Sequence, residues 1–195
     1  MNSNILIINS AEPGISEFYL SIEEVLKPLN TRFKSIEYKE SQNIDFNHWD
    51  GIIITGSPKG DDIVAHHLPY FQWIPACGKP VLGICAGHHI TGVLYGAKLL
   101  RNREPESGDS EVGIINEDPI LDGIDSPFKV KQMHNDSITL PGGFIQLATS
   151  HVCKNQLMKH KSKPVYTCQF HPEFYNADIF RNFIRIVNNS QDSVK

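Results

Sequence analysis

Short runs of apolar and β-branched residues recur along the chain, separated by polar and turn-forming residues. They occupy residues 4–9, 32–39, 51–55, 80–85, 144–150 and 164–170. Runs of this length and composition predict β-strands. Because most of them are continuously apolar rather than alternating, we expect these strands to be buried on both faces of a sheet.

Helical periodicity fills several of the intervals between these strands. In residues 16–27, apolar side chains recur at helical spacing behind Ser16, a typical N-cap residue. Residues 66–77, 87–96 and 176–188 show similar patterns. Strands interleaved with helices predict an α/β fold, with a mostly parallel, doubly wound sheet and helices on both faces.

The segment from 97 to 143 is less regular. The short candidate strands in it are AKLLRN, EVGIINE and FKVKQMH, which we expect to form a small antiparallel addition to the sheet. No repeat, linker or charge run divides the 195 residues, of which 40% are hydrophobic. We therefore expect one domain over residues 1–195.

Charge and composition narrow the classes of function. A formal net charge of -4 with mixed signs gives no basic face for nucleic acid. No apolar run reaches the ~20 residues of a membrane span, and the N-terminal sequence lacks a signal-peptide pattern, so we expect a cytoplasmic protein. The four cysteines form no C-x-x-C pair, and we expect them to stay reduced.

The stretch VLGICAGHHI, residues 81–90, places Cys85 directly after a predicted buried strand. In an open α/β sheet, ligands bind outside the carboxyl ends of the strands. Gly83 and Gly87 would permit a sharp strand-to-helix turn, and the partial positive charge of a helix N-terminus favours a thiolate. This pattern indicates a nucleophile, although free cysteines are also often simple core residues.

A base for this thiol is found in QFHPEF, residues 169–174, at the end of another predicted strand. Pro172 favours extended geometry at His171, and residues two apart in an extended segment point the same way. His171 and Glu173 are therefore expected to project together as a base and the group that orients it. The alternative is a surface turn that holds a His and a Glu by chance.

A third stretch, IIITGSPKG at residues 52–60, is a buried strand that opens into a Gly/Pro turn. Backbone N–H groups of such a turn, together with the N–H of Ala86, could form an oxyanion hole. Taken by itself this signal is weak, because many loops follow the same pattern.

The three stretches, in this order, resemble the class I glutamine amidotransferases, which carry a Cys-His-Glu triad. The resemblance extends from ILIIN to the final helix. Within the family, residues 130–144 (VKQMHNDSITLPGGF) and 156–173 (QLMKHKSKPVYTCQFHPE) are most similar to the glutaminase domain or separate glutaminase subunit of GMP synthase, an enzyme of purine biosynthesis.

This resemblance implies a mechanism. Cys85 would attack the side-chain carboxamide of glutamine to form a thioester, His171 would transfer the proton to ammonia, and Glu173 would orient the imidazole. The resemblance places the residues that stabilise the oxyanion and bind the substrate in two groups. The oxyanion hole would use backbone N–H groups of Ala86 and of Ser57 or Gly56, and substrate would contact His89, Met133, His134, Asn135 and Asp136.

Three positions depart from the family pattern. His89 stands where a Gln usually helps to hold the substrate, Asn135 replaces a common Gly, and Ser57 replaces a Gly in the oxyanion turn. Imidazole and carboxamide differ in shape and in hydrogen-bonding groups. The chemistry is thus expected to be retained, while the substrate could be L-glutamine or another γ-glutamyl compound.

The resemblance implies no cofactor. The histidines lack H-x-x-x-H and H-E-x-x-H spacing, so we predict no metal site. No P-loop is present to activate an acceptor, so ammonia is expected to pass to a separate synthetase partner. Two alternatives stay open, a stand-alone thiol hydrolase of γ-glutamyl amides or peptides, and a non-catalytic regulatory relative.

Overall fold

The computed structural model describes residues 3–58 and 63–192. Five parallel strands form one half of the main sheet, and four antiparallel strands extend it. The parallel strands are β1 (Asn4–Asn9), β2 (Arg32–Glu37), β3 (Gly51–Ile54), β4 (Val81–Ile84) and β11 (Val165–Cys168). The antiparallel strands are β6 (Glu106–Ile114), β7 (Phe128–His134), β9 (Phe144–Thr149) and β10 (Leu157–His160).

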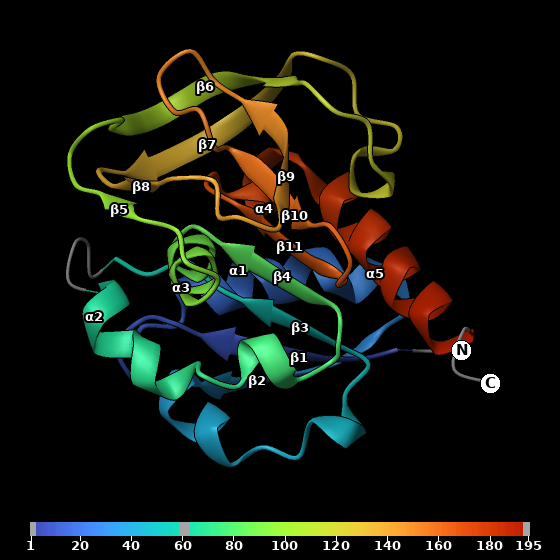
Figure 1. The fold of residues 1–195 in the computed structure, drawn as a ribbon. Helices are drawn as coiled ribbons and strands as arrows, with labels where there is room; N and C mark the ends of the chain where they lie inside the picture. The colour runs from blue at the N-terminus through green and yellow to red at the C-terminus, as the bar shows by residue number, and fades with distance from the viewer. Residues whose placement is uncertain (1–2, 59–62, 193–195) are drawn as a thin grey trace.

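Within the described residues the strand order of this sheet is β2-β1-β3-β4-β11-β10-β9-β6-β7 (Figure 1). Two further strands, β5 (Leu99–Leu100) and β8 (Ser137–Ile138), pair with each other. The expected α/β fold with a mostly parallel sheet and an antiparallel addition is confirmed, and the addition is larger than the sequence indicated.

Helices cover both faces of the parallel strands (Figure 1). They are α1 (Glu17–Leu26), α2 (Ile63–His67), α3 (Ala86–Leu94), α4 (Pro172–Tyr175) and α5 (Ala177–Asp192). In β1, Ile5 and Ile7 pack in the cluster with α1 and α5, whereas Leu6 and Ile8 pack in the cluster that contains Ile90 of α3. Burial on both faces is the reason that this strand is continuously apolar.

One local expectation about helices was wrong. Residues 66–77 do not form a helix, because α2 ends at His67 and short 3-10 helices follow at Leu68–Tyr70 and Ile74–Ala76. Each of these contains a proline, Pro69 or Pro75, which cannot continue an α-helix. Ser16 does occupy the N-cap position of α1, but its side chain makes no capping hydrogen bond.

Further 3-10 helices connect the main elements. They span Lys27–Leu29, Tyr38–Asn43, Phe46–His48 and Pro119–Leu121. The second of these replaces the end of the strand expected at residues 32–39. Among the described residues, no helix combines the length and the apolar character needed to cross a membrane.

Strands β3, β4 and β11 are neighbours in the sheet, and their carboxyl ends meet at one edge. Helix α3 packs on these ends at very short range. A Cβ built on Gly83 of β4 would lie 2.6 Å from the carbonyl oxygen of Gly87, and one built on Gly87 would lie 2.6 Å from the carbonyl oxygen of Ile54. The residues that follow the three strands are thereby brought to a common crevice.

We predict that Gly83→Ala destabilises the protein by about 1–3 kcal/mol, because the new methyl group must displace backbone rather than a flexible side chain. Urea denaturation of both proteins measures this free energy of unfolding. The matched control is Gly142→Ala, whose Cβ would have no atom within 4 Å and which should change stability by less than about 0.5 kcal/mol. Equal stability of the two variants would contradict the role assigned to the helix–strand contact.

Candidate active site

Cys85 lies in the turn between β4 and α3, where it is the N-cap residue of the helix. Its backbone has φ 50° and ψ −100°, a conformation that an L-residue rarely adopts. The backbone N–H of Cys85 donates a 2.8 Å hydrogen bond to the carbonyl of Cys168 at the end of β11. The side chain is therefore held at the strand ends, next to the N-terminus of α3, as the sequence predicted.

His171 and Glu173 are in direct contact, as expected. The distance from Nδ1 of His171 to Oε1 of Glu173 is 2.7 Å, and both side chains are 1% exposed. The local structure differs from the prediction, because Pro172 begins the short helix α4 and Glu173 lies in its first turn. Only His171 is extended, at the N-cap, so the contact is made across a helix start.

Cys85 also lies close enough to the His171 imidazole to interact with it electrostatically, so His171 stands between Cys85 and Glu173. Burial by itself would lower the pKa of His171. The negative charges of the Cys85 thiolate and the Glu173 carboxylate outweigh that cost and raise the pKa to about 10. At neutral pH the arrangement therefore favours a protonated His171 imidazole.

The turn after β3 is held by Thr55, which is fully buried. The Thr55 hydroxyl donates to the carbonyl of Gly56 over 2.9 Å and accepts from the N–H of Ser10 over 3.0 Å. In a trans peptide the C=O and N–H groups point in opposite directions, so fixing this carbonyl also fixes the N–H of Ser57. Gly56 itself packs against His171, since a Cβ there would lie 2.6 Å from Cε1 of the ring.

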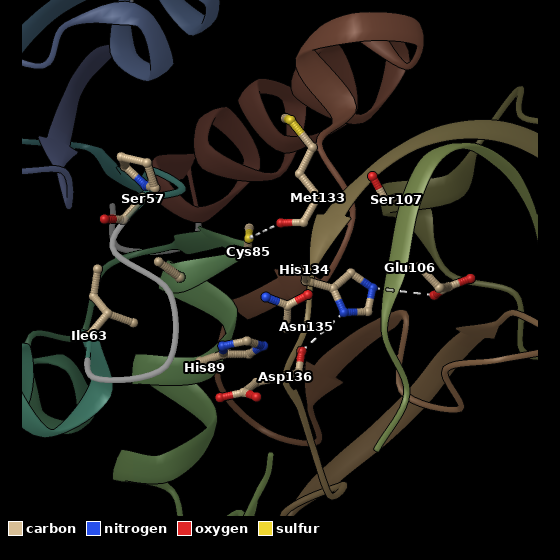
Figure 2. Close-up of a pocket in the computed structure, with 12 residues that line it drawn as sticks. Ser57, Ile63, Cys85, His89, Glu106, Ser107, Met133, His134, Asn135 and Asp136 are labelled. Atoms are coloured by element: carbon tan, nitrogen blue, oxygen red, sulfur yellow. Dashed lines mark hydrogen bonds and ion pairs between the residues drawn. The ribbon is translucent and has the colours of Figure 1, made fainter. Parts of the chain in front are cut away.

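A pocket of about 220 Å³ opens beside the Cys85 sulfur (Figure 2). The residues expected to bind substrate are brought together here, with others that the sequence did not single out. Its lining consists of Ser57, Pro58, Ile63, Cys85, Ala86, His89, Glu106, Ser107, Met133, His134, Asn135 and Asp136. Gly56, His171 and Glu173 are not among these lining residues.

The end of β7 and the loop after it form one wall of the pocket, opposite Ser57 (Figure 2). Met133 and Asn135 are exposed, whereas His134 and Asp136 are buried. The Met133 carbonyl lies 3.8 Å from the Cys85 sulfur. Asp136 accepts a 2.9 Å hydrogen bond from the backbone N–H of Asn102, which anchors this wall.

His89, on α3, is only 5% exposed, and burial lowers the pKa of its imidazole to about 4. The ring is therefore neutral at physiological pH. Its Nε2 lies 2.7 Å from the side-chain oxygen Oε1 of Gln169, which can only accept, so Nε2 carries the proton. Gln169 belongs to the QFHPEF motif, but nothing in the sequence paired it with His89.

We predict that iodoacetamide alkylates Cys85 faster than Cys77 at neutral pH, because a protonated His171 imidazole lies beside the Cys85 sulfur. Glu173→Gln removes a charge that raises the His171 pKa, so the imidazole is less often protonated at neutral pH and the alkylation of Cys85 should slow. Mass spectrometry of the labelled peptides measures the rate, and the half-buried Cys77 serves as the internal reference. An unchanged rate in Glu173→Gln would contradict the ion-pair assignment.

Comparisons with known proteins agree with this geometry. The family model described as glutamine amidotransferase class-I matches residues 15–185. A glutamine-hydrolyzing GMP synthase subunit of Thermoplasma acidophilum is 36% identical over 143 residues, covering 70% of this chain and 72% of that protein. The protein of the same name from Thermococcus kodakarensis is 33% identical over 173 residues, covering 86% and 87%.

Solved structures give the same result. The crystal structure of a putative GMP synthase subunit from Thermoplasma acidophilum has a TM-score of 0.89 and 28% identity, covering 98% of this chain and 97% of that one. A glutamine amidotransferase from Thermotoga maritima, at 18% identity, shares the fold with a TM-score of 0.75, covering 99% and 85% of the two chains. The chain belongs to the class-I glutamine amidotransferase family.

Proposed function

We propose that this chain is the glutamine-hydrolysing subunit of a GMP synthase-type enzyme, which releases ammonia from L-glutamine for a separate synthetase subunit in purine biosynthesis. The observation that carries the proposal is the hydrogen-bonded pair of His171 and Glu173, placed close to Cys85 and the pocket beside its sulfur. Relatives named as glutamine-hydrolyzing GMP synthase subunits support the choice of partner. All four cysteines are free thiols, which suits a reducing cytoplasm.

In the proposed reaction the Cys85 sulfur attacks the carboxamide carbon of the glutamine side chain. His171 holds the thiol proton and delivers it to the departing nitrogen, so that ammonia leaves and a thioester remains. Glu173 fixes the tautomer and orientation of the imidazole through Nδ1. Water then attacks the thioester with His171 as base, which yields glutamate and restores the thiol.

The negative charge of the tetrahedral intermediate needs donors that are already in position. Ala86 supplies one N–H, since it is the first residue of α3 and the first N–H groups of a helix have no partner within it. Ser57 supplies the other, because Thr55 orients its peptide. We assign Gly56 to positioning, since its missing side chain leaves room for the His171 ring.

Residues 133–136, at the end of β7 and in the loop after it, are proposed to receive the amino acid end of the substrate together with His89. They line the pocket together with Cys85. The His89 ring is neutral and is held by Gln169, so it meets substrate as an uncharged group and not as a cation. This arrangement favours a small γ-glutamyl substrate, with free glutamine as the first candidate.

We predict glutamate release from L-glutamine by the purified chain, and loss of at least about 10³-fold of this activity in Cys85→Ala. Adding the synthetase subunit is expected to stimulate turnover. A parallel panel of γ-glutamyl amides and peptides tests the alternative substrates. If a panel compound is turned over and glutamine is not, that compound is the substrate instead of glutamine. If neither assay shows Cys85-dependent turnover, the proposal is refuted.

The oxyanion assignment predicts that Thr55→Val lowers kcat by about 10- to 100-fold with a smaller change in KM, because the Ser57 N–H loses its fixed orientation. Thr55→Ser, which keeps the hydroxyl, should retain most of the activity. A purely structural role would lower the melting temperature and the rate of Cys85 alkylation as well. Equal kcat values in Thr55→Val and Thr55→Ser would contradict the assignment of the Ser57 N–H to the oxyanion hole.

A further inference from the structure

Three side chains that take no part in the proposed proton transfers converge at the side of the pocket formed by β6 and β7. They are Glu106 of β6, His134 of β7 and Cys153 in the loop before β10, and their ligand-forming atoms all lie within 4.8 Å of one another. The Glu106 and His134 side chains are 7% and 1% exposed, and Cys153 is completely buried. A carboxylate, an imidazole and a thiol together form a ligand set typical of zinc and other borderline-soft divalent cations.

The hydrogen bonds of His134 fix which nitrogen faces the cluster. Its Nδ1 lies 3.0 Å from the backbone carbonyl of Asp136, which can only accept, so Nδ1 carries a proton. In a neutral ring, Nε2 then has a lone pair and no hydrogen. It faces Oε2 of Glu106 at 3.3 Å (Figure 2). Two acceptor atoms at this distance need either a proton or a cation between them. In metal-binding histidines, the ring nitrogen that does not bind the metal usually donates its N–H to a carbonyl or carboxylate, as Nδ1 of His134 does here.

The spacing of these atoms suits a cation. Zinc forms bonds of about 2.0–2.1 Å to imidazole nitrogen and carboxylate oxygen, so two such ligands in a tetrahedron lie about 3.3–3.4 Å apart. The distance from Nε2 of His134 to Oε2 of Glu106 is 3.3 Å. A cation could therefore bind both atoms without moving either side chain.

The cluster is also held in place by its neighbours. Ser150 donates a 2.9 Å hydrogen bond to Oε1 of Glu106 and accepts a 2.8 Å bond from the backbone N–H of Cys153. Gln156 donates to Oε2 of Glu106. A second carboxylate, Glu104, lies close enough to interact electrostatically with the Cys153 thiol. Fixed ligands of this kind lower the cost of ordering a site around an ion.

We propose that Glu106, His134 and Cys153 form a binding site for zinc or a similar divalent cation, with Glu104 within reach as a fourth ligand. On binding, the Cys153 thiol loses its proton to solvent as the metal–sulfur bond forms, while Nε2 of His134 and a Glu106 oxygen donate lone pairs. No group is oxidised or reduced. Because Glu106 and His134 also line the pocket, the pocket provides the path by which the ion enters.

Cobalt(II) binding tests this proposal, because a thiolate ligand gives cobalt a sulfur-to-metal charge-transfer band in the near ultraviolet. The titration uses CoCl2 and the Cys85→Ala protein, which excludes the proposed nucleophile as a ligand and makes the result independent of the glutaminase activity. We expect one equivalent of cobalt to produce the band and ZnCl2 to displace it. Adding Cys77→Ser as the matched control should leave the spectrum unchanged.

Adding Cys153→Ser to Cys85→Ala should abolish the charge-transfer band, and adding Glu106→Gln should raise the cobalt Kd by at least about tenfold. Circular dichroism confirms that each variant is folded. Glu106→Gln preserves the shape of the side chain, so it decides the question if the Cys153 variant fails to fold. The absence of a cobalt band in Cys85→Ala, or an unchanged Kd in the folded variants, would overturn the proposal and leave a protonated His134–Glu106 ion pair as the explanation.

Discussion

Helix α3 packs on the ends of β3 and β4 so closely that the backbone itself forms the contact. Gly83 and Gly87 face neighbouring carbonyl oxygens at distances that no Cβ tolerates. This close packing forces the intervening turn to be sharp and holds Cys85 at a positive φ, with its N–H bonded to the end of β11. The thiol, the turn after β3 and His171 meet at one point because their three strands are neighbours in the sheet.

Much of this arrangement could be predicted from the sequence. Continuously apolar strands report burial on both faces, and β1 packs against helices on both sides. Cys85 and His171 each follow such a strand, and the carboxyl ends of parallel strands share one edge. The proximity of residues far apart in the sequence could therefore be predicted without tertiary contacts, because each of them follows a parallel strand.

Other features depended on contacts that carry no local signal. Apolar periodicity over residues 66–77 favoured a helix, yet Pro69 and Pro75 limit the segment to short 3-10 turns. The link between His89 and Gln169 joins two motifs that were interpreted separately. The cluster of Glu106, His134 and Cys153 comes from three separate segments, so spacing rules for metal sites, which detect ligands close in sequence, could not find it.

The two halves of the sheet form different parts of the pocket. Cys85, Ala86 and His89 belong to the turn and helix that follow the parallel strand β4, whereas Glu106, Ser107 and the loop at 133–136 belong to the antiparallel strands β6 and β7 and the loop beyond. The proposed nucleophile thus lies on the parallel half, and of the residues proposed to bind substrate only His89 shares that half. Substitutions in the antiparallel half could therefore reshape most of the proposed substrate wall while the turn that carries Cys85 keeps its backbone.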